Sequence, residues 1–156
     1  DSLFRLHYLI RHTRGETTEF DRPAMVRFHM LLAGRLLRAR QLRLHVLTVD
    51  GRDIAVHYAF HYGNTTSYYQ SGFDPDDAWR SFGPGERIMV HAIRRAIEDG
   101  DTAFDFLRGD ESYKQRWAHR SRRDLMLRAP GTLRGQAVIA LYRAARAART
   151  RLRRKA

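Results

Sequence analysis

The fold is decided by residues 42–73, which read LRLHVLTVDGRDIAVHYAFHYGNTTSYYQSGF. Apolar and polar residues alternate along most of this stretch, which is the period of a β-strand. The alternation is interrupted at Asp50-Gly51 and at Gly63-Asn64, and dipeptides of this kind are typical of two-residue hairpin turns. The pattern predicts a meander of three consecutive antiparallel strands, the first from Leu42 to the Asp50-Gly51 turn and the others over residues 54–62 and 67–73.

A helix and a fourth strand are predicted after the meander. The apolar residues between Met89 and Ile97 fall on one face of a helix, and Gly100 supplies its end. Residues 102–107 (TAFDFL) then have the composition of a short buried strand. Because a helical crossover joins parallel strands, the last strand of the meander and residues 102–107 should be parallel neighbours. A short helix over residues 113–119 and a further strand over residues 124–128 complete this part.

Two helices are predicted before the sheet. Residues 2–13 place Leu3, Leu6 and Ile10 at helical spacing. Asp21-Arg22-Pro23 then reads as an N-cap followed by a first-turn proline, and this helix runs to about Arg40. The order of elements predicts an α/β (mixed α+β) fold class, with a central mixed sheet that combines an antiparallel meander with a crossover helix.

Charge is distributed unevenly along the 156 residues. The net charge is +12, but residues 134–156 hold seven Arg, one Lys and no acid. We therefore expect one globular domain over residues 1–131 and a basic helix over residues 132–156. Val138, Leu141 and Tyr142 begin a weak apolar stripe in that tail. Two interpretations stay open: the tail contacts an anionic membrane or nucleic acid, or it packs on the domain or on a neighbouring subunit.

Several function classes are excluded or disfavoured by composition. The chain has no cysteine, which excludes disulfide frameworks, thiolate metal sites and cysteine nucleophiles. The sequence has neither a signal-peptide pattern nor an apolar run of about 20 residues. We expect a cytoplasmic protein, with the tail as a candidate for attachment to the inner face of the membrane. His57 and His61 lie about 13 Å apart on one strand, too far for one metal ion, and no metal site is predicted.

The junction before the crossover helix has the composition of a phosphate-binding loop. It reads Arg80-Ser-Phe-Gly-Pro-Gly85, an R-x-x-G-x-G pattern. Glycines let backbone N–H groups approach an anion, and the N-terminus of a helix carries about half a positive charge. The alternative is a turn that needed two glycines and a proline to start a helix.

At this junction the sequence resembles the acyl-CoA pyrophosphate loop of GNAT acyltransferases. A second motif runs from Phe104 to Trp117 (FDFLRGDESYKQRW) and is similar to the closing half of FemAB-like and CelD(BcsL)-type GNAT proteins. The resemblance extends to about residue 128. It implies the GNAT acyl-CoA N-acyltransferase fold, acyl-CoA (acetyl-CoA) as co-substrate and no metal. The sequence departs from many relatives at Phe82-Gly83-Pro84-Gly85, where they have a plain Ser-Pro-Gly.

The resemblance also implies which residues hold the donor. The acyl-CoA would lie between the third strand and the strand over residues 102–107. The implied cofactor-binding residues are Tyr69, Gln70, Ser71, Arg80, Phe82, Gly83, Gly85 and Glu86. Tyr113 takes the place of the tyrosine that meets the sulfur atom, the alternative being an aromatic packed on the sheet.

Two further residues are candidates for catalysis. Asp105 lies between Phe104 and Phe106. Burying a carboxylate among aromatic residues is costly unless it has an interaction partner or a functional role. Asp105 would act as a base or orient the amine, or else pair with an arginine. Lys114 is one of only two lysines in an Arg-rich chain, and its compact ammonium suits a thiolate or a phosphate. The alternative is a surface lysine.

Together these features predict an N-acyltransferase that acts by direct attack of an amine on a thioester. The acceptor expected by analogy is an amino sugar or another cell-envelope or polysaccharide precursor. One rival interpretation exchanges the donor for an aminoacyl-tRNA, and another is a non-catalytic scaffold half. Because the chain opens at Asp1 and such proteins commonly carry two GNAT-like halves, we also expect a missing N-terminal half. A homodimer is a further candidate arrangement.

Overall fold

The computed structural model describes residues 1–125, 127 and 129–153. The chain divides into two compact units, residues 1–118 and residues 119–156. The first unit contains the sheet, three α-helices and the cavity considered below. The second contains one long helix.

A four-stranded sheet with the order β1-β2-β3-β4 forms the centre of the first unit. Its strands are β1 (Leu42–Val49), β2 (Arg52–Tyr62), β3 (Thr65–Phe73) and β4 (Ala103–Asp105). The first three pair antiparallel, so the predicted meander is confirmed. Both hairpins turn through two residues with positive φ, Asp50 (47°) and Gly51 (76°) in the first, Gly63 (54°) and Asn64 (58°) in the second. Such turns match the twist of the flanking strands, which explains the dipeptides found there.

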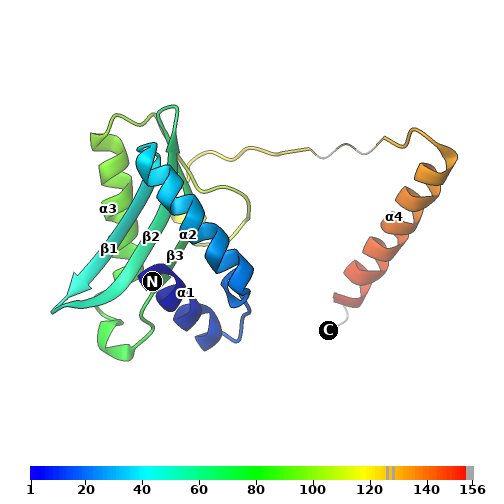
Figure 1. Ribbon diagram of the computed structural model, residues 1–156. Coiled ribbons are helices and arrows are strands. Elements are labelled where there is room, and N and C mark those ends of the chain that lie inside the picture. The colour runs from blue at the N-terminus through cyan, green and yellow to red at the C-terminus, as the bar shows by residue number, and fades with distance from the viewer. Residues whose placement is uncertain (126, 128, 154–156) are drawn as a thin grey trace. The chain divides into compact units, whose positions relative to one another are not determined.

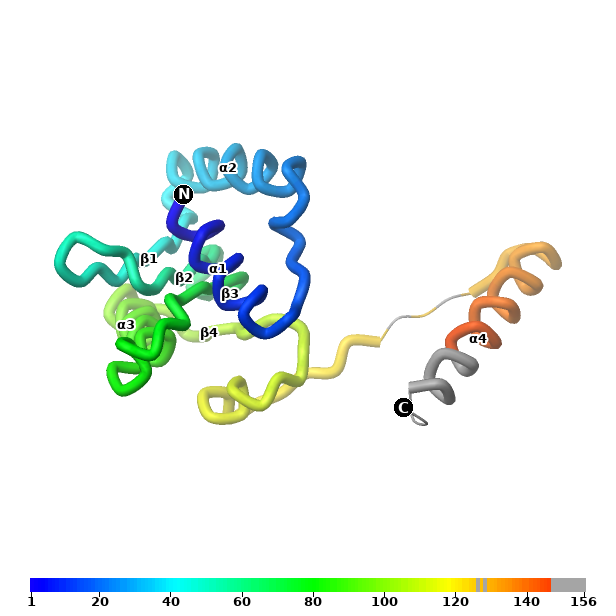
Figure 2. Tube along the Cα trace, turned by 90° about the horizontal axis from the view of Figure 1, so that it is seen from below, coloured from blue at the N-terminus to red at the C-terminus, as the bar shows by residue number. Residues whose placement is uncertain are grey.

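The helices cover both faces of the sheet. Helices α1 (Ser2–Thr13) and α2 (Pro23–Arg38) lie on one face, and α3 (Pro84–Glu98) lies on the other (Figures 1 and 2). Between α1 and α2 a short 3₁₀ helix, η1 (Glu19–Asp21), is fixed by a capping box with Thr18. Leu6 and Tyr58 belong to the core on the α1 side, and Tyr68 and Met89 to the core on the α3 side.

Helix α3 is the crossover that the sequence predicted, because β3 and β4 are parallel neighbours. Their pairing covers only three positions and ends at Ser67 and Asp105. Strand β4 is therefore shorter than the predicted residues 102–107. Beyond it Leu107 adopts a φ of 54°, which turns the chain away from β3. The two strands thus part toward their C-terminal ends.

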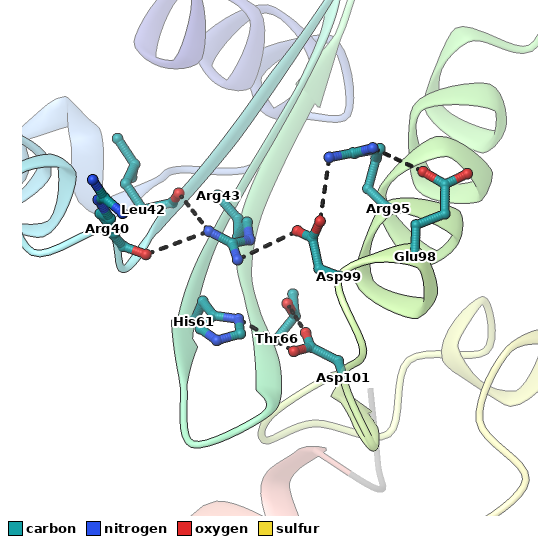
Figure 3. Close-up of polar contacts among 9 residues, drawn as sticks. All are labelled: Arg40, Leu42, Arg43, His61, Thr66, Arg95, Glu98, Asp99 and Asp101. Carbon is teal, nitrogen blue, oxygen red and sulfur yellow. Dashed lines mark hydrogen bonds and ion pairs between the residues drawn. The ribbon is translucent and has the colours of Figure 1, made fainter.

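A polar network ties the loop between α3 and β4 to the end of the sheet at which β3 and β4 begin (Figure 3). Thr66 Oγ1 donates to Asp101 Oδ2 at 2.6 Å, and His61 Nδ1 lies 3.3 Å from Asp101 Oδ1. Arg43 in β1 pairs with Asp99 at 3.3 Å. The Asp101 side chain is buried, so these contacts hold it where an unpaired carboxylate would be costly. Three strands are thereby fixed to the end of the crossover.

Later parts of the chain differ from expectation. The predicted helix over residues 113–119 is reduced to a 3₁₀ turn, η3 (Lys114–Arg116). The strand predicted over residues 124–128 is wrong where the structure describes it, since residues 124, 125 and 127 form no strand; residues 126 and 128 lie outside the described residues. Leu125 and Leu127 are almost fully exposed, so this stretch buries no apolar surface. The tail does form the expected helix, α4 (Leu133–Arg153).

Candidate active site

A cavity of about 620 Å³ opens where β3 and the chain after β4 part. Its walls come from the end of α1, the second half of β3, the start of α3 and residues 106–117. Most of the predicted site residues line it: Tyr69, Gln70, Ser71, Arg80, Gly83, Gly85, Glu86, Tyr113 and Lys114. Phe82 and Asp105 are absent from the lining.

A β-bulge shapes the strand that borders the cavity. Tyr58 pairs with Gln70 and Ala59 pairs with Tyr68, so Tyr69 is an extra residue in β3. A bulge lets neighbouring side chains leave a strand on the same side. Accordingly, Tyr69 Oη donates to Glu19 Oε1 at 2.9 Å and Gln70 Nε2 lies 3.5 Å from the same oxygen. Burial, with help from Glu19, raises the pKa of Tyr69 to about 12.

On the α3 side of the sheet, Tyr113 joins a hydrogen-bonded row of hydroxyls. Tyr113 bonds to Tyr68, and Tyr68 Oη lies 2.6 Å from Ser71 Oγ. Burial raises the pKa of the Tyr113 phenol above its ordinary value, and the contact with Tyr68 acts in the same direction. Tyr113, which lines the cavity, therefore stays protonated at neutral pH. Such a group is suited to donating a hydrogen bond to a developing thiolate.

Lys114 is buried, and its side chain binds groups of the loop over residues 108–111. Its Nζ donates to the Arg108 carbonyl at 2.7 Å and lies 2.8 Å from Glu111 Oε2. The bond from Lys114 holds the pKa of Glu111 below its usual value. The ammonium is thus already neutralised by protein groups, and it fixes the segment that carries Tyr113. Lys114 is not the surface lysine of the alternative interpretation.

The R-x-x-G-x-G loop begins α3 at the mouth of the cavity. Gly83 is the N-cap, with a φ of 59°, and its Cβ position is open. A Cβ on Gly85 would come within 2.9 Å of the Phe73 ring, so glycine permits close packing of the helix on β3. Glu86 lies in the first turn, where its N–H donates to the Gly83 carbonyl at 3.1 Å. Arg80 pairs with Asp77 at 2.5 Å, and both side chains are about four-fifths exposed.

The two predicted residues outside the lining have local partners. The Arg87 guanidinium lies over the ring of Phe82, with 4.4 Å between Arg87 Cζ and the ring centroid. The Phe82 carbonyl accepts a hydrogen bond from Arg87 Nε at 2.6 Å. Asp105 Oδ1 accepts from the Leu107 N–H at 2.7 Å. The Asp105 carboxylate therefore stabilises the turn in which Leu107 takes its positive φ. Neither role follows from the sequence motif, because both depend on how the loops close.

Helix α1 makes contacts that the sequence did not reveal. His7 Nδ1 donates to the Ser71 carbonyl at 2.7 Å, and burial lowers the pKa of His7. The helix approaches β3 so closely that a Cβ on Gly72 would lie 2.3 Å from the His7 nitrogen. Arg11 and Arg14, at the end of α1, line the cavity as well. Only the docking of α1 on β3 brings these residues to the site, and no local motif marks them.

The part of the chain that the structure describes offers no group of three His, Asp or Glu side chains placed for a metal ion. In the same part, no helix is both long and apolar enough to cross a membrane.

Comparison with known proteins gives one family match and two similar solved structures. The family described as Acetyltransferase (GNAT) domain matches residues 1–115. Aminoglycoside N-acetyltransferase AAC(6′)-Iy in complex with CoA is 15% identical, with a TM-score of 0.47 over 66% of this chain and 87% of that one. The same enzyme with a CoA-linked bisubstrate analogue is 16% identical, with a TM-score of 0.49 over 65% of this chain and 78% of that one. No curated protein matches.

The match over residues 1–115 decides the class: this chain belongs to the acetyltransferase (GNAT) domain family. The predicted GNAT superfamily and acyltransferase activity are confirmed by this match, and the predicted fold class is confirmed by the mixed sheet with its meander and crossover helix. The FemAB-like and CelD-type subgroup stays a prediction.

Proposed function

We propose that this domain transfers an acetyl group from acetyl-CoA to the amine of a small molecule, as a FemAB-like or CelD-type member of its family. The expected acceptor is an amino sugar or another precursor of the cell envelope or of a polysaccharide. The observation that carries the proposal is the cavity between the parted β3 and β4, which both the start of α3 and Tyr113 line.

The donor would occupy the gap between the strands. Beyond Ser67, the β4-facing edge of β3 pairs with no strand among residues 1–118, so backbone groups of Tyr69 to Ser71 can bind the amide and carbonyl groups of the pantetheine arm. The pyrophosphate would lie at Gly83 to Gly85, at the positive end of α3. Arg80 can join it, because an ion pair as exposed as Arg80–Asp77 contributes little and is easily exchanged.

The reaction would be a direct aminolysis. The neutral amine attacks the thioester carbonyl, an amide C–N bond forms, and the C–S bond breaks to release CoA. The amine loses one proton and the departing thiolate gains one. Tyr113 donates a hydrogen bond to the sulfur as its negative charge develops. Asp105 can orient the acceptor only if its carboxylate releases the Leu107 N–H.

A pair of variants at Gly83 tests the donor site. Asp and Asn both tolerate a positive φ and both cap helices well, so each variant should fold. The Cβ position at Gly83 is open, which removes steric conflict as a cause. Gly83→Asp places a carboxylate where the phosphates would lie and should abolish the rise in melting temperature that CoA causes. Gly83→Asn should retain most of it.

The comparison that decides the proposal is made on the unaltered chain. CoA and acetyl-CoA should raise its melting temperature, whereas tRNA should not. No shift at millimolar CoA would refute the donor assignment. A shift with tRNA alone would favour an aminoacyl-tRNA donor, and CoA binding without transfer to any amine would favour a scaffold.

We further propose that α4 attaches the protein to an anionic surface. Leu133, Val138 and Leu141 are largely exposed within the second unit, and residues 134–156 are strongly basic. Each basic residue near an anionic membrane contributes about 1 kcal/mol, so charge outweighs the short apolar stripe.

A further inference from the structure

One wall of the cavity is strongly basic. It is formed by the last turn of α1 and by the segment after β4. Its cationic residues, which we call the basic wall, are Arg11, Arg14, Arg108, Lys114 and Arg116. Glu111 is the acid that lines the same wall. The two segments face each other closely enough for the charge of Arg11 to act on both Glu111 and Tyr113.

Part of this charge is neutralised by the protein, and part of it is not. Arg11 pairs with Glu16 at 2.6 Å, and Lys114 pairs with Glu111 at 2.8 Å. The other three, Arg14, Arg108 and Arg116, are exposed and form no ion pair within residues 1–118. Three guanidinium groups therefore remain at the basic wall with free hydrogen-bond donors.

The part of the cavity lining between β3 and the start of α3 has more acidic than basic residues. Asp74, Asp76 and Glu86 line it together with Arg80. The Asp74 carboxylate is bound by Arg52 and by the Asp76 N–H, and the Asp76 carboxylate caps the Ala78 N–H. The positive charge of the cavity is thus concentrated away from the start of α3, where the proposed function seats the pyrophosphate of the donor. The excess of cations therefore lies along the part of the cavity that the proposed pyrophosphate site leaves free.

An acceptor must suit this wall chemically. Guanidinium groups bind phosphate and carboxylate through paired hydrogen bonds, and they repel ammonium groups. Nearby positive charge also lowers the pKa of an amine, which favours the neutral form that attacks a thioester. A plain polycationic amine would be repelled, whereas an amine on an anionic molecule would be attracted and held.

We infer that the acceptor is an amine that carries an anionic group, a phosphate or a carboxylate, bound by Arg14, Arg108 and Arg116. This inference rests on the proposed function and adds the class of acceptor. The anion would fix the orientation of the molecule at the basic wall, with its amine directed toward the cavity near Tyr113. The acyl transfer itself is unchanged.

The test compares matched amines on the full chain with acetyl-CoA. Glucosamine 6-phosphate is compared with glucosamine, alanine with alanine amide, and spermidine serves as the polycation. Charged hydrogen bonds contribute enough for a preference of about 10- to 100-fold in KM for the anionic member of a pair. The pair that shows it identifies the anion as phosphate or carboxylate. The preference should shrink as salt is raised.

Variants separate the basic wall from the donor site. Arg108→Gln with Arg116→Gln should abolish the preference by raising KM for the anionic amine of each pair toward that of its neutral partner. Arg94→Gln, an exposed arginine of α3 outside the cavity lining, should change neither KM and is the matched control. Calorimetric binding of glucosamine 6-phosphate and alanine to the CoA complex gives a readout that does not depend on turnover.

Each unfavourable result has a definite meaning. If CoA binds but neutral or polycationic amines are preferred, the inference is overturned and the proposed function stands. If the double variant weakens binding of CoA but not of dephospho-CoA, the basic wall holds the 3′-phosphate of the donor, and the inference is again overturned. If the unaltered chain binds no CoA, the proposed function fails and the inference fails with it.

Discussion

Replacing His57 by leucine should make the protein less sensitive to acid. His57 lies in the middle of β2, fully buried, stacked on Tyr68 with 4.9 Å between ring centroids. Neither of its ring nitrogens has a hydrogen-bond partner. Leaving a buried polar group unpaired costs about 1–3 kcal/mol, and losing the stacking forfeits about 0.5–1.5 kcal/mol. At pH 7 the leucine variant should therefore be more stable than the wild type by roughly 1 kcal/mol.

The pH dependence gives the larger effect. Burial lowers the pKa of His57 from 6.5 to about 3, with smaller contributions from His45 and His91. The folded state therefore binds fewer protons than the unfolded state between these values, so stability is complete above pH 6.5 and falls as the pH drops toward 3. The slope for one group is about 1.4 kcal/mol per pH unit. Between pH 6.5 and pH 4 His57 alone should cost about 3 kcal/mol of stability.

Urea unfolding of the wild type and the variant at several values between pH 7 and pH 4 measures this directly. The difference in free energy of unfolding should widen toward acid pH by about 3 kcal/mol. His7, His29 and His45, whose pKa values burial also lowers, will leave a residual slope in both proteins. His119→Leu, at an exposed histidine, is the control and should follow the wild type. Parallel curves for His57→Leu and the wild type would refute the reasoning.

Three further predictions can be tested independently. Tyr113→Phe should lower kcat by about 10²–10⁴ without loss of stability if the phenol assists the departing thiolate, and full turnover would contradict that role. Gly72→Ala should cost at least about 1–3 kcal/mol in urea unfolding, because its Cβ would lie 2.3 Å from the backbone nitrogen of His7. Gly34→Ala, in the open middle of α2, should instead gain about 0.5–1 kcal/mol, and equal effects of the two would count against the close contact. Deleting residues 132–156 should abolish salt-sensitive binding to anionic liposomes with unchanged melting of the domain, whereas a large fall in melting temperature would show that the tail packs on it.

The sequence predicted most of the fold because its signals are local. The alternation of residues 42–73 and the two turn dipeptides require only neighbouring residues to act, and the structure contains the meander with those turns. The crossover helix was also predicted correctly, because its apolar residues recur at helical spacing. The expected strand over residues 124–128 shows the limit of such reasoning, since a short alternating stretch becomes a strand only when another strand pairs with it.

For the site, the sequence determined which residue types lie at the R-x-x-G-x-G loop and in the FDF…YK…W motif, and it led to nine lining residues of the cavity. The tertiary structure alone decided how they meet. The bulge at Tyr69 turns the side chains of Tyr69 and Gln70 toward Glu19. At the turn where Leu107 has a positive φ, the Asp105 carboxylate accepts a hydrogen bond from the Leu107 N–H. Packing of α1 on Gly72 brings Arg11 and Arg14 to the cavity. These outcomes depend on contacts between segments that lie 50 or more residues apart, or on how a loop closes, and periodicity along the chain carries no information about either.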